Sequence, residues 1–159
     1  LISTSEKMLA DVAKQVDVQL NALPRKDIAK QSLENSRFVL VHDKAEAMDL
    51  SNAYAPEHLI IATSDYEVLA SQVVNAGSVF LGRWACESAG DYASGTHQYA
   101  LAYNGVNLDS FNRKITFQHL SEKGVRSIGH AVVCMAENEL LEAHAQAMRL
   151  RINDLNETR

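Results

Sequence analysis

Residues 56 to 82 read "PEHLIIATSDYEVLASQVVNAGSVFLG", and this stretch decides the fold class. Two short apolar runs, 58–63 and 77–82, have the length and composition of buried strands. Between them, residues 65–76 begin at an aspartate and end before a glycine, as a helix does. A strand, a helix and a second strand in this order predict a parallel sheet whose strands are joined by crossover helices. Such short apolar strands suit a sheet that is covered on both faces.

The same alternation continues on both sides of this stretch. The spacing of apolar residues predicts further elements, which are helices over 3–23, 25–36 and 44–55, strands over 37–42 and 113–120, and helices over 121–139 and 139–155. The predicted fold class is therefore α/β, a parallel sheet with crossover helices that is followed by a C-terminal helical tail. The last two helices have no following strand on which to pack.

Composition narrows the possible function classes. The chain has 159 residues, enough for one domain with a real core, and a net charge of −5 argues against a large basic surface for nucleic acid. No segment is apolar enough to cross a bilayer, and the first residues do not form a signal peptide. Two cysteines make neither a disulfide framework nor a metal-binding cysteine cluster. We expect a cytoplasmic protein without a membrane or nucleic-acid partner.

The segment after the strand 77–82 is the first place to look for chemistry, because ligands of open parallel sheets bind beyond the carboxyl ends of the strands. Residues 83–100, "RWACESAGDYASGTHQYA", are rich in small residues that let the backbone approach a ligand closely. Asp91 could offer an oxygen ligand to a metal. The alternative is an ordinary turn, because Gly, Asp and Ser dominate turns for local reasons. The density of small residues in this predicted loop favours a site over an ordinary turn.

Glu57 and His58 stand side by side at the edge of the predicted strand 58–63. A histidine titrates near neutral pH, and a neighbouring carboxylate can activate water, so the pair suits acid–base chemistry. A dipeptide alone is also typical of a solvated loop before a strand.

Glu139 and His144 are the remaining acid and histidine of interest. On one straight helix a spacing of five turns them roughly 140° apart, at about 100° per residue, so one helix face would not present both. Spacing alone favours a surface glutamate and an ordinary helix histidine. Cys134, in "AVVCMA", reads as a buried apolar residue rather than a reactive thiol.

Four motifs, in this order, resemble the histidinol dehydrogenase family. They are "PEHL" (56–59), "NAGSVFLG" (75–82), "ESAGDYASGT" (87–96) and the tail "LLEAHAQAMRLRIN" (140–153). The resemblance covers nearly the whole chain and implies the C-terminal portion of such an enzyme. It implies that residues 1–104 are part of the second Rossmann-like domain, whose parallel sheet is partial here, and that residues 105–159 are a C-terminal helical tail used for dimerisation.

The resemblance also implies an activity. This family oxidises L-histidinol to L-histidine in histidine biosynthesis, by two NAD-dependent steps through L-histidinal, and it holds zinc. Carried over by position, His58 is the general base that removes the hydroxyl proton, and Glu57 activates water. The resemblance likewise implies that Asp91 and His144 are zinc ligands, and that Glu139, together with His58, Asp91 and His144, binds the substrate. It implies that Glu139 and His144 serve the site of the partner subunit in a homodimer.

The same resemblance implies what this chain lacks. A Gln and a His that complete the zinc site, the first α/β domain and most of the NAD site belong to upstream segments of the family. We therefore expect the isolated chain to be inactive. Two alternatives stay open: a non-catalytic dimerisation module, and a related zinc- and NAD-dependent dehydrogenase of another amino alcohol or sulfonate. The motive for the second is the segment 97–103, which departs from the family pattern.

Overall fold

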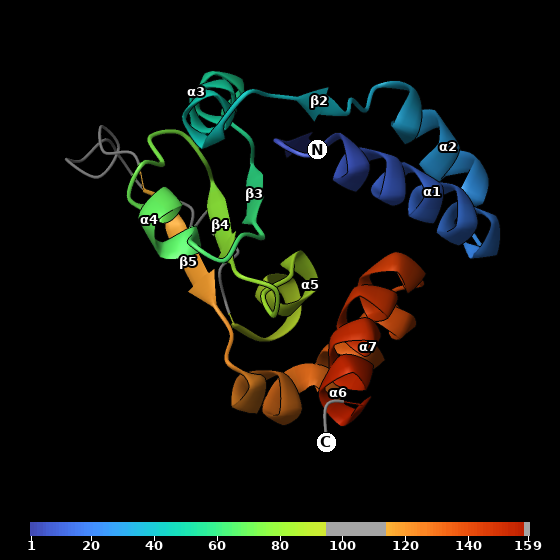
Figure 1. Cartoon of the computed structure of the whole chain (residues 1–159). Coiled ribbons are helices and arrows are strands. Elements are labelled where there is room, and N and C mark those ends of the chain that lie inside the picture. Colours follow the sequence, from blue (N-terminus) through green and yellow to red (C-terminus); the bar gives the residue numbers. More distant parts are fainter. Residues whose placement is uncertain (95–113, 158–159) are drawn as a thin grey trace, which may run out of the picture. The chain divides into compact units, whose positions relative to one another are not determined.

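A computed structural model describes residues 1–94 and 114–157 of the chain. They divide into two compact units, residues 1–53 and residues 54–159, and each unit is described by itself (Figure 1). The predicted domain boundary at residue 104 lies outside the described residues.

The first unit is mostly helical. Its elements are the strands β1 (Ile2–Ser3) and β2 (Val39–Leu40) and the helices α1 (Glu6–Ala22), α2 (Lys26–Glu34) and α3 (Lys44–Tyr54), the last of which runs one residue into the second unit. The strand predicted over 37–42 shrinks to β2. It pairs in parallel with β1 within the first unit, and Leu40 is exposed. The strand over 37–42 is therefore shorter than expected, with only Val39–Leu40 in a strand.

The second unit holds the parallel sheet that the stretch 56–82 predicts. Its strands are β3 (His58–Ile61), β4 (Ser78–Leu81) and β5 (Thr116–His119), hydrogen-bonded in the order β3-β4-β5. All pairs are parallel, and His58, Ser78 and Thr116 stand in register at the amino end. The α/β class with parallel strands, connecting helices and helices at the end of the chain is confirmed.

Helical segments cover opposite faces of this sheet. Gln118 and His119 are neighbours on β5, so their side chains point to opposite faces. His119 stacks on Tyr66 of α4 (Tyr66–Ala70), and its Nε2 lies 3.1 Å from the Tyr66 hydroxyl. Gln118 is buried and its side chain hydrogen-bonds that of Ser94. Ser94 ends η1 (Gly90–Ser94), a π-helical turn that continues α5 (Glu87–Ala89).

Two of these elements differ from the sequence expectation. The segment after β4 is not an open loop where it is described, because α5 and η1 are helical. The helix predicted over 65–76 is limited to α4 and ends at Ala70, before the β-branched pair Val73 and Val74. Adjacent β-branched residues lose rotamer freedom in a helix and so disfavour its extension.

The last two helices form a hairpin that packs on the segment after β4. They are α6 (Glu122–Asn138) and α7 (Glu142–Glu157), which lie side by side in Figure 1. The buried core that joins them to α5 consists of Cys86, Ala89, Leu120, Val125, Val132, Met148 and Leu155. Gly129 lets the helices approach closely, since a Cβ there would stand 2.9 Å from Ile152. Cys134 is exposed, so its predicted burial is wrong.

Polar contacts supplement this core. Arg151 donates a hydrogen bond from Nη2 to the carbonyl oxygen of Ala85 at 2.8 Å. Arg83 forms an ion pair with Asp154 and lies over the ring of Trp84. Among the described residues, none of the helices has the length and apolarity that crossing a membrane requires.

Replacing Gly77 by alanine should destabilise the second unit. A Cβ at this position would stand 2.7 Å from the backbone oxygen of Glu57, and a backbone atom cannot move aside as a flexible side chain does. The Gly77 nitrogen also donates to Pro56 and its oxygen accepts from Thr116, so the residue is held on both sides. We expect a loss of about 1–3 kcal/mol in the free energy of unfolding, measured by urea denaturation.

Gly124→Ala is the matched control. Its Cβ would meet the nearest atoms at 3.5 Å, an ordinary contact, and alanine favours the helix by about 1 kcal/mol. Unfolding midpoints that move in the same direction for both variants would contradict this account of Gly77.

Candidate functional site

The two helical turns after β4 present two carboxylates on one side. Glu87 begins α5 and Asp91 is the second residue of η1, so they are four residues apart in a helical segment and lie on neighbouring turns. Ser88, Ala89 and Gly90 between them are buried, which leaves the two acids directed outward. π-helical turns are rare and occur often at functional sites, because one extra residue redirects a side chain.

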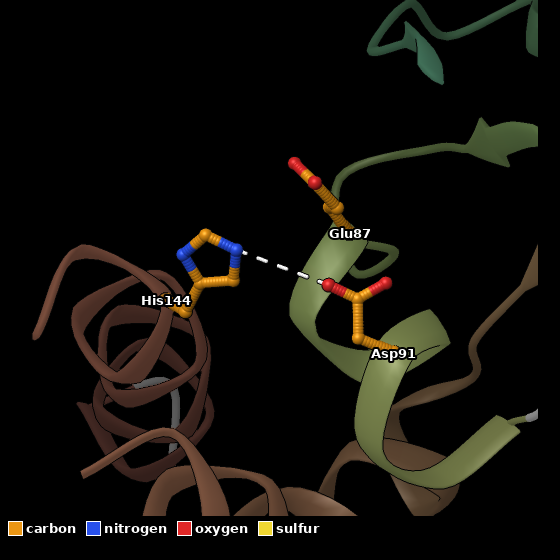
Figure 2. A group of neighbouring side chains, drawn as sticks. All are labelled: Glu87, Asp91 and His144. Atoms are coloured by element: carbon orange, nitrogen blue, oxygen red, sulfur yellow. Dashed lines mark ion pairs between the residues drawn. The ribbon is translucent and has the colours of Figure 1, made fainter. Parts of the chain in front are cut away.

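His144 completes a group of three ligand-bearing residues. Its ring nitrogen and the carboxylate oxygens of Glu87 and Asp91 all lie within 4.8 Å of one another, and all three side chains are partly buried. Figure 2 shows the imidazole of α7 directed at the carboxylate of Asp91, with Glu87 above it on α5. The distance from His144 Nε2 to Asp91 Oδ2 is 3.8 Å. Two carboxylates this close repel each other, so the group favours a cation.

Packing holds His144 in this position. The next residue, Ala145, is fully buried, and Met148 one turn further on is buried in the core shared with α5. The side chains of His144 and Asp91 are 30% and 15% exposed. An ion pair of this kind contributes about 0–1 kcal/mol, whereas burying one large apolar side chain contributes about 1.5–3 kcal/mol. The hairpin core therefore brings the two side chains together, and their mutual attraction is secondary.

Glu139 and His144 do not share one helix, contrary to the sequence expectation. α6 ends at Asn138, and Leu140 adopts a left-handed backbone conformation with φ of 58° before α7 begins at Glu142. The angle computed for one straight helix therefore does not apply. The helix is interrupted at Leu140, and this turn directs both Glu139 and His144 toward the α5–η1 segment.

Glu139 meets Tyr92, a residue that the sequence did not single out. The Tyr92 hydroxyl donates a hydrogen bond to Glu139 Oε2 at 2.7 Å. Desolvation, followed by this hydrogen bond and the charge of Glu139, raises the pKa of Tyr92 to about 12. The sequence does offer one indication of Tyr92, because it directly follows Asp91. Only the fold shows that the connection between α6 and α7, which contains Glu139, lies next to Tyr92.

His58 is the fourth member of the site. It is the first residue of β3, and its Nδ1 lies 3.1 Å from Oε1 of Glu87. Its ring packs edge-on against the buried Phe80, with ring centroids 5.8 Å apart. Glu57 next to it is exposed and is not among the residues whose ligand atoms cluster. Its backbone oxygen accepts a hydrogen bond from Ser78 at 2.8 Å.

The site lies at the amino end of the sheet, not beyond the carboxyl ends of the strands. α5 folds back over one face and brings Glu87 to the first residue of β3. A separate cavity of about 510 Å³ does lie at the carboxyl ends, where Thr63, Gly82 and His119 follow or end the three strands. None of the clustered acids lines it. The segment after β4 therefore carries two of the three clustered residues, but they lie near the amino end of β3 and not beyond the carboxyl ends of the strands.

All these contacts are made within one chain. The sequence expectation assigned Glu139 and His144 to the partner subunit's site, whereas here they meet Tyr92 and Asp91 of their own chain. The departing segment 97–103 lies outside the described residues. The arrangement offers carboxylate oxygens and an imidazole nitrogen for a metal such as zinc, and a second imidazole for proton transfer.

Comparison with known proteins finds the same family that the sequence motifs indicate. A family model described as "Histidinol dehydrogenase" matches residues 1–152. Histidinol dehydrogenase from Bacteroides thetaiotaomicron is 56% identical over 98% of this chain and 38% of its own length. The enzyme named "Histidinol dehydrogenase, chloroplastic" from Oryza sativa subsp. japonica is 49% identical over 94% of this chain and 33% of its own.

A solved structure agrees as well. The crystal structure of histidinol dehydrogenase from Elizabethkingia anophelis is 47% identical, with a TM-score of 0.60 over 98% of this chain and 37% of that one. The chain thus spans about a third of the length of these relatives, consistent with the expected C-terminal portion. A match over nearly every residue of the chain is too extensive for the fold alone to explain, and the chain belongs to the histidinol dehydrogenase family.

Proposed function

We propose that this chain is the part of a histidinol dehydrogenase that supplies its general base and half of its zinc ligands. The proposed reaction oxidises L-histidinol to L-histidine through L-histidinal, with NAD as the hydride acceptor. The observation that carries the proposal is the convergence of His58, Asp91 and His144 around Glu87, from three elements of the fold. Identity of 56% to a histidinol dehydrogenase does not favour a non-catalytic dimerisation module.

His58 would take the hydroxyl proton of histidinol as a hydride leaves the carbinol carbon for NAD. A neutral imidazole is suited to this step because one of its ring nitrogens carries a lone pair that can accept a proton. Glu57 would activate the water that attacks the aldehyde-level carbon. Its exposure leaves the carboxylate open to water and to segments that this chain does not contain.

Asp91 and His144 would hold zinc. Carboxylate oxygen and imidazole nitrogen are ordinary zinc ligands, and a cation relieves the repulsion between Asp91 and Glu87. When bound, zinc supplies a positive charge that holds and polarises the substrate. Glu139, held by the Tyr92 hydroxyl, would bind the polar end of the substrate beside it. The remaining zinc ligands and the NAD site would come from upstream segments.

We also propose a homodimer in which the tail of each chain completes the site of its partner. Identical chains can exchange an identical element and keep every contact, so the contacts of α6 and α7 seen within one chain are also available between two. The cytoplasmic location stays a prediction, since plant relatives are named chloroplastic.

The proposed reaction predicts turnover of histidinol. The protein extended upstream to its natural start and supplied with zinc should form NADH from histidinol. His58→Ala should lower kcat by about 10²–10⁴, the usual contribution of a general base. Removal of zinc by a chelator should abolish turnover, and added zinc should restore it. NADH formation is followed by its absorbance.

The 159-residue chain by itself is the negative control. It should give no turnover, because the upstream ligands are missing. Turnover by this chain alone, or a folded and zinc-loaded full protein that leaves histidinol unchanged, would contradict the proposal. Oxidation of another amino alcohol instead would support the alternative that the segment 97–103 motivates.

Mixing two inactive variants of the protein extended to its natural start tests the exchange of tails between subunits. In the proposed dimer, a His58→Ala chain and a His144→Ala chain form one complete site per mixed dimer. A random mixture should therefore recover about a quarter of wild-type activity, because half of its dimers are mixed and each has one of two sites. If each site is built within one chain, as in the present structure, the mixture should recover nothing.

The pKa of the Tyr92 hydroxyl depends on Glu139, so it can be used to test their contact. Burial and the Glu139 carboxylate raise the pKa of Tyr92 to about 12, so the folded chain keeps a proton that the unfolded chain releases near pH 10. Stability should therefore fall as pH rises from about 10 toward 12. Glu139→Gln should lower the Tyr92 pKa part of the way, because desolvation remains, as measured by phenolate absorbance. Glu137→Gln, an exposed neighbour bound to Arg149, is the control and should leave it unchanged.

A further inference from the structure

His58 has a carboxylate partner to which the roles above assign nothing. Its Nδ1 lies 3.1 Å from Oε1 of Glu87, within hydrogen-bonding distance. The two side chains are 22% and 38% exposed, so water competes only partly for either group. They come from the first residue of β3 and the first residue of α5, and only the fold of α5 over the sheet brings them together.

Buried neighbouring residues hold both His58 and Glu87 in place. The His58 ring is fixed by its edge-on contact with Phe80, which is 1% exposed. Glu87 is flanked by buried residues, Cys86 before it and Ser88 after it, whose side chains lie 3.3 Å apart. An orienting residue must itself be fixed, since a mobile carboxylate would give no preferred ring position.

The contact decides which imidazole nitrogen can accept a proton. A neutral imidazole carries its hydrogen on one nitrogen and a lone pair on the other. A carboxylate only accepts hydrogen bonds, so Glu87 favours the tautomer with hydrogen on Nδ1. Nε2 is then the basic nitrogen, and the imidazolium that forms after proton transfer is stabilised by the same carboxylate.

We propose that Glu87 is a positioning residue that accepts a hydrogen bond from Nδ1 of His58 and so fixes the tautomer and orientation of the general base. This inference rests on the proposed function, in which His58 is that base. It separates Glu87 from Asp91 in role, although both carboxylates belong to the same group of ligand-bearing residues. Asp91 faces the metal with His144, and Glu87 faces the base.

The test uses the zinc-loaded protein extended to its natural start. Glu87→Gln keeps the shape of the side chain but can present an N–H to Nδ1, which favours the wrong tautomer. We expect kcat to fall roughly 10- to 100-fold, a part of what a general base contributes, with an unchanged KM for histidinol and unchanged zinc content. Glu87→Asp, which keeps a carboxylate, should recover part of the loss. Glu67→Gln, an exposed glutamate in the first turn of α4, is the matched control and should behave as wild type.

A second readout reports the tautomer directly. Nitrogen chemical shifts of ¹⁵N-histidine-labelled protein, with His58→Ala to assign the signal, should show hydrogen on Nδ1 of His58 in the wild type and a change in Glu87→Gln. Hydrogen on Nε2 in the wild type would overturn the proposal even if the glutamine variant failed to fold.

The kinetic outcomes separate the two proposals. Loss of zinc from Glu87→Gln would make Glu87 a metal ligand, and an unchanged kcat would leave it without a role in the reaction; either result overturns the positioning role. A wild type that does not oxidise histidinol would instead refute the proposed function, whatever Glu87 does.

Discussion

The site depends on one packing arrangement, the α6–α7 hairpin against the helical turns after β4. Ala89, Val132 and Met148 are fully buried where these elements meet. Each large apolar side chain buried there contributes about 1.5–3 kcal/mol, more than a partly exposed ion pair. His144 and Glu139 therefore reach the α5–η1 segment because the core holds the hairpin, and their own polar contacts choose only the final rotamers.

A second constraint acts at the other side of the same segment. The chain leaves β4 at its carboxyl end, yet Glu87 contacts the amino-terminal residue of β3. α5 achieves this because its buried Ala89 packs on the hairpin while Gln118 and Ser94 tie η1 to the sheet. One short helical segment thus contacts His58 on one flank and brings Asp91 to His144 on the other. Small residues at 88–90 allow this close packing, which explains why the motif is rich in them.

Several elements followed from the sequence because their causes are local. The apolar runs at 58–61 and 78–81, with a helix between them, predicted parallel strands, and β3 and β4 are parallel. Residue type and position indicate Glu57, His58 and Asp91 as candidates; Asp91 lies in the clustered group, and His58 contacts it. Where the sequence misled, the cause was tertiary. No glycine marks the turn at Leu140, so the five-residue spacing of Glu139 and His144 suggests one straight helix. The strand expected over 37–42 is limited to Val39–Leu40, where β2 pairs with β1.

The sequence by itself determined the alternation of strands and helices, the family, and the types of side chain available for proton transfer and metal binding. These are properties of neighbouring residues, whose periodicity and composition act over a few positions. The tertiary structure alone decided which groups face each other: Glu87 with His58, Asp91 with His144, and Tyr92 with Glu139. Each pair joins elements far apart in the chain, and the distance between them is set by how the apolar side chains of the sheet and the hairpin pack, which no local pattern records.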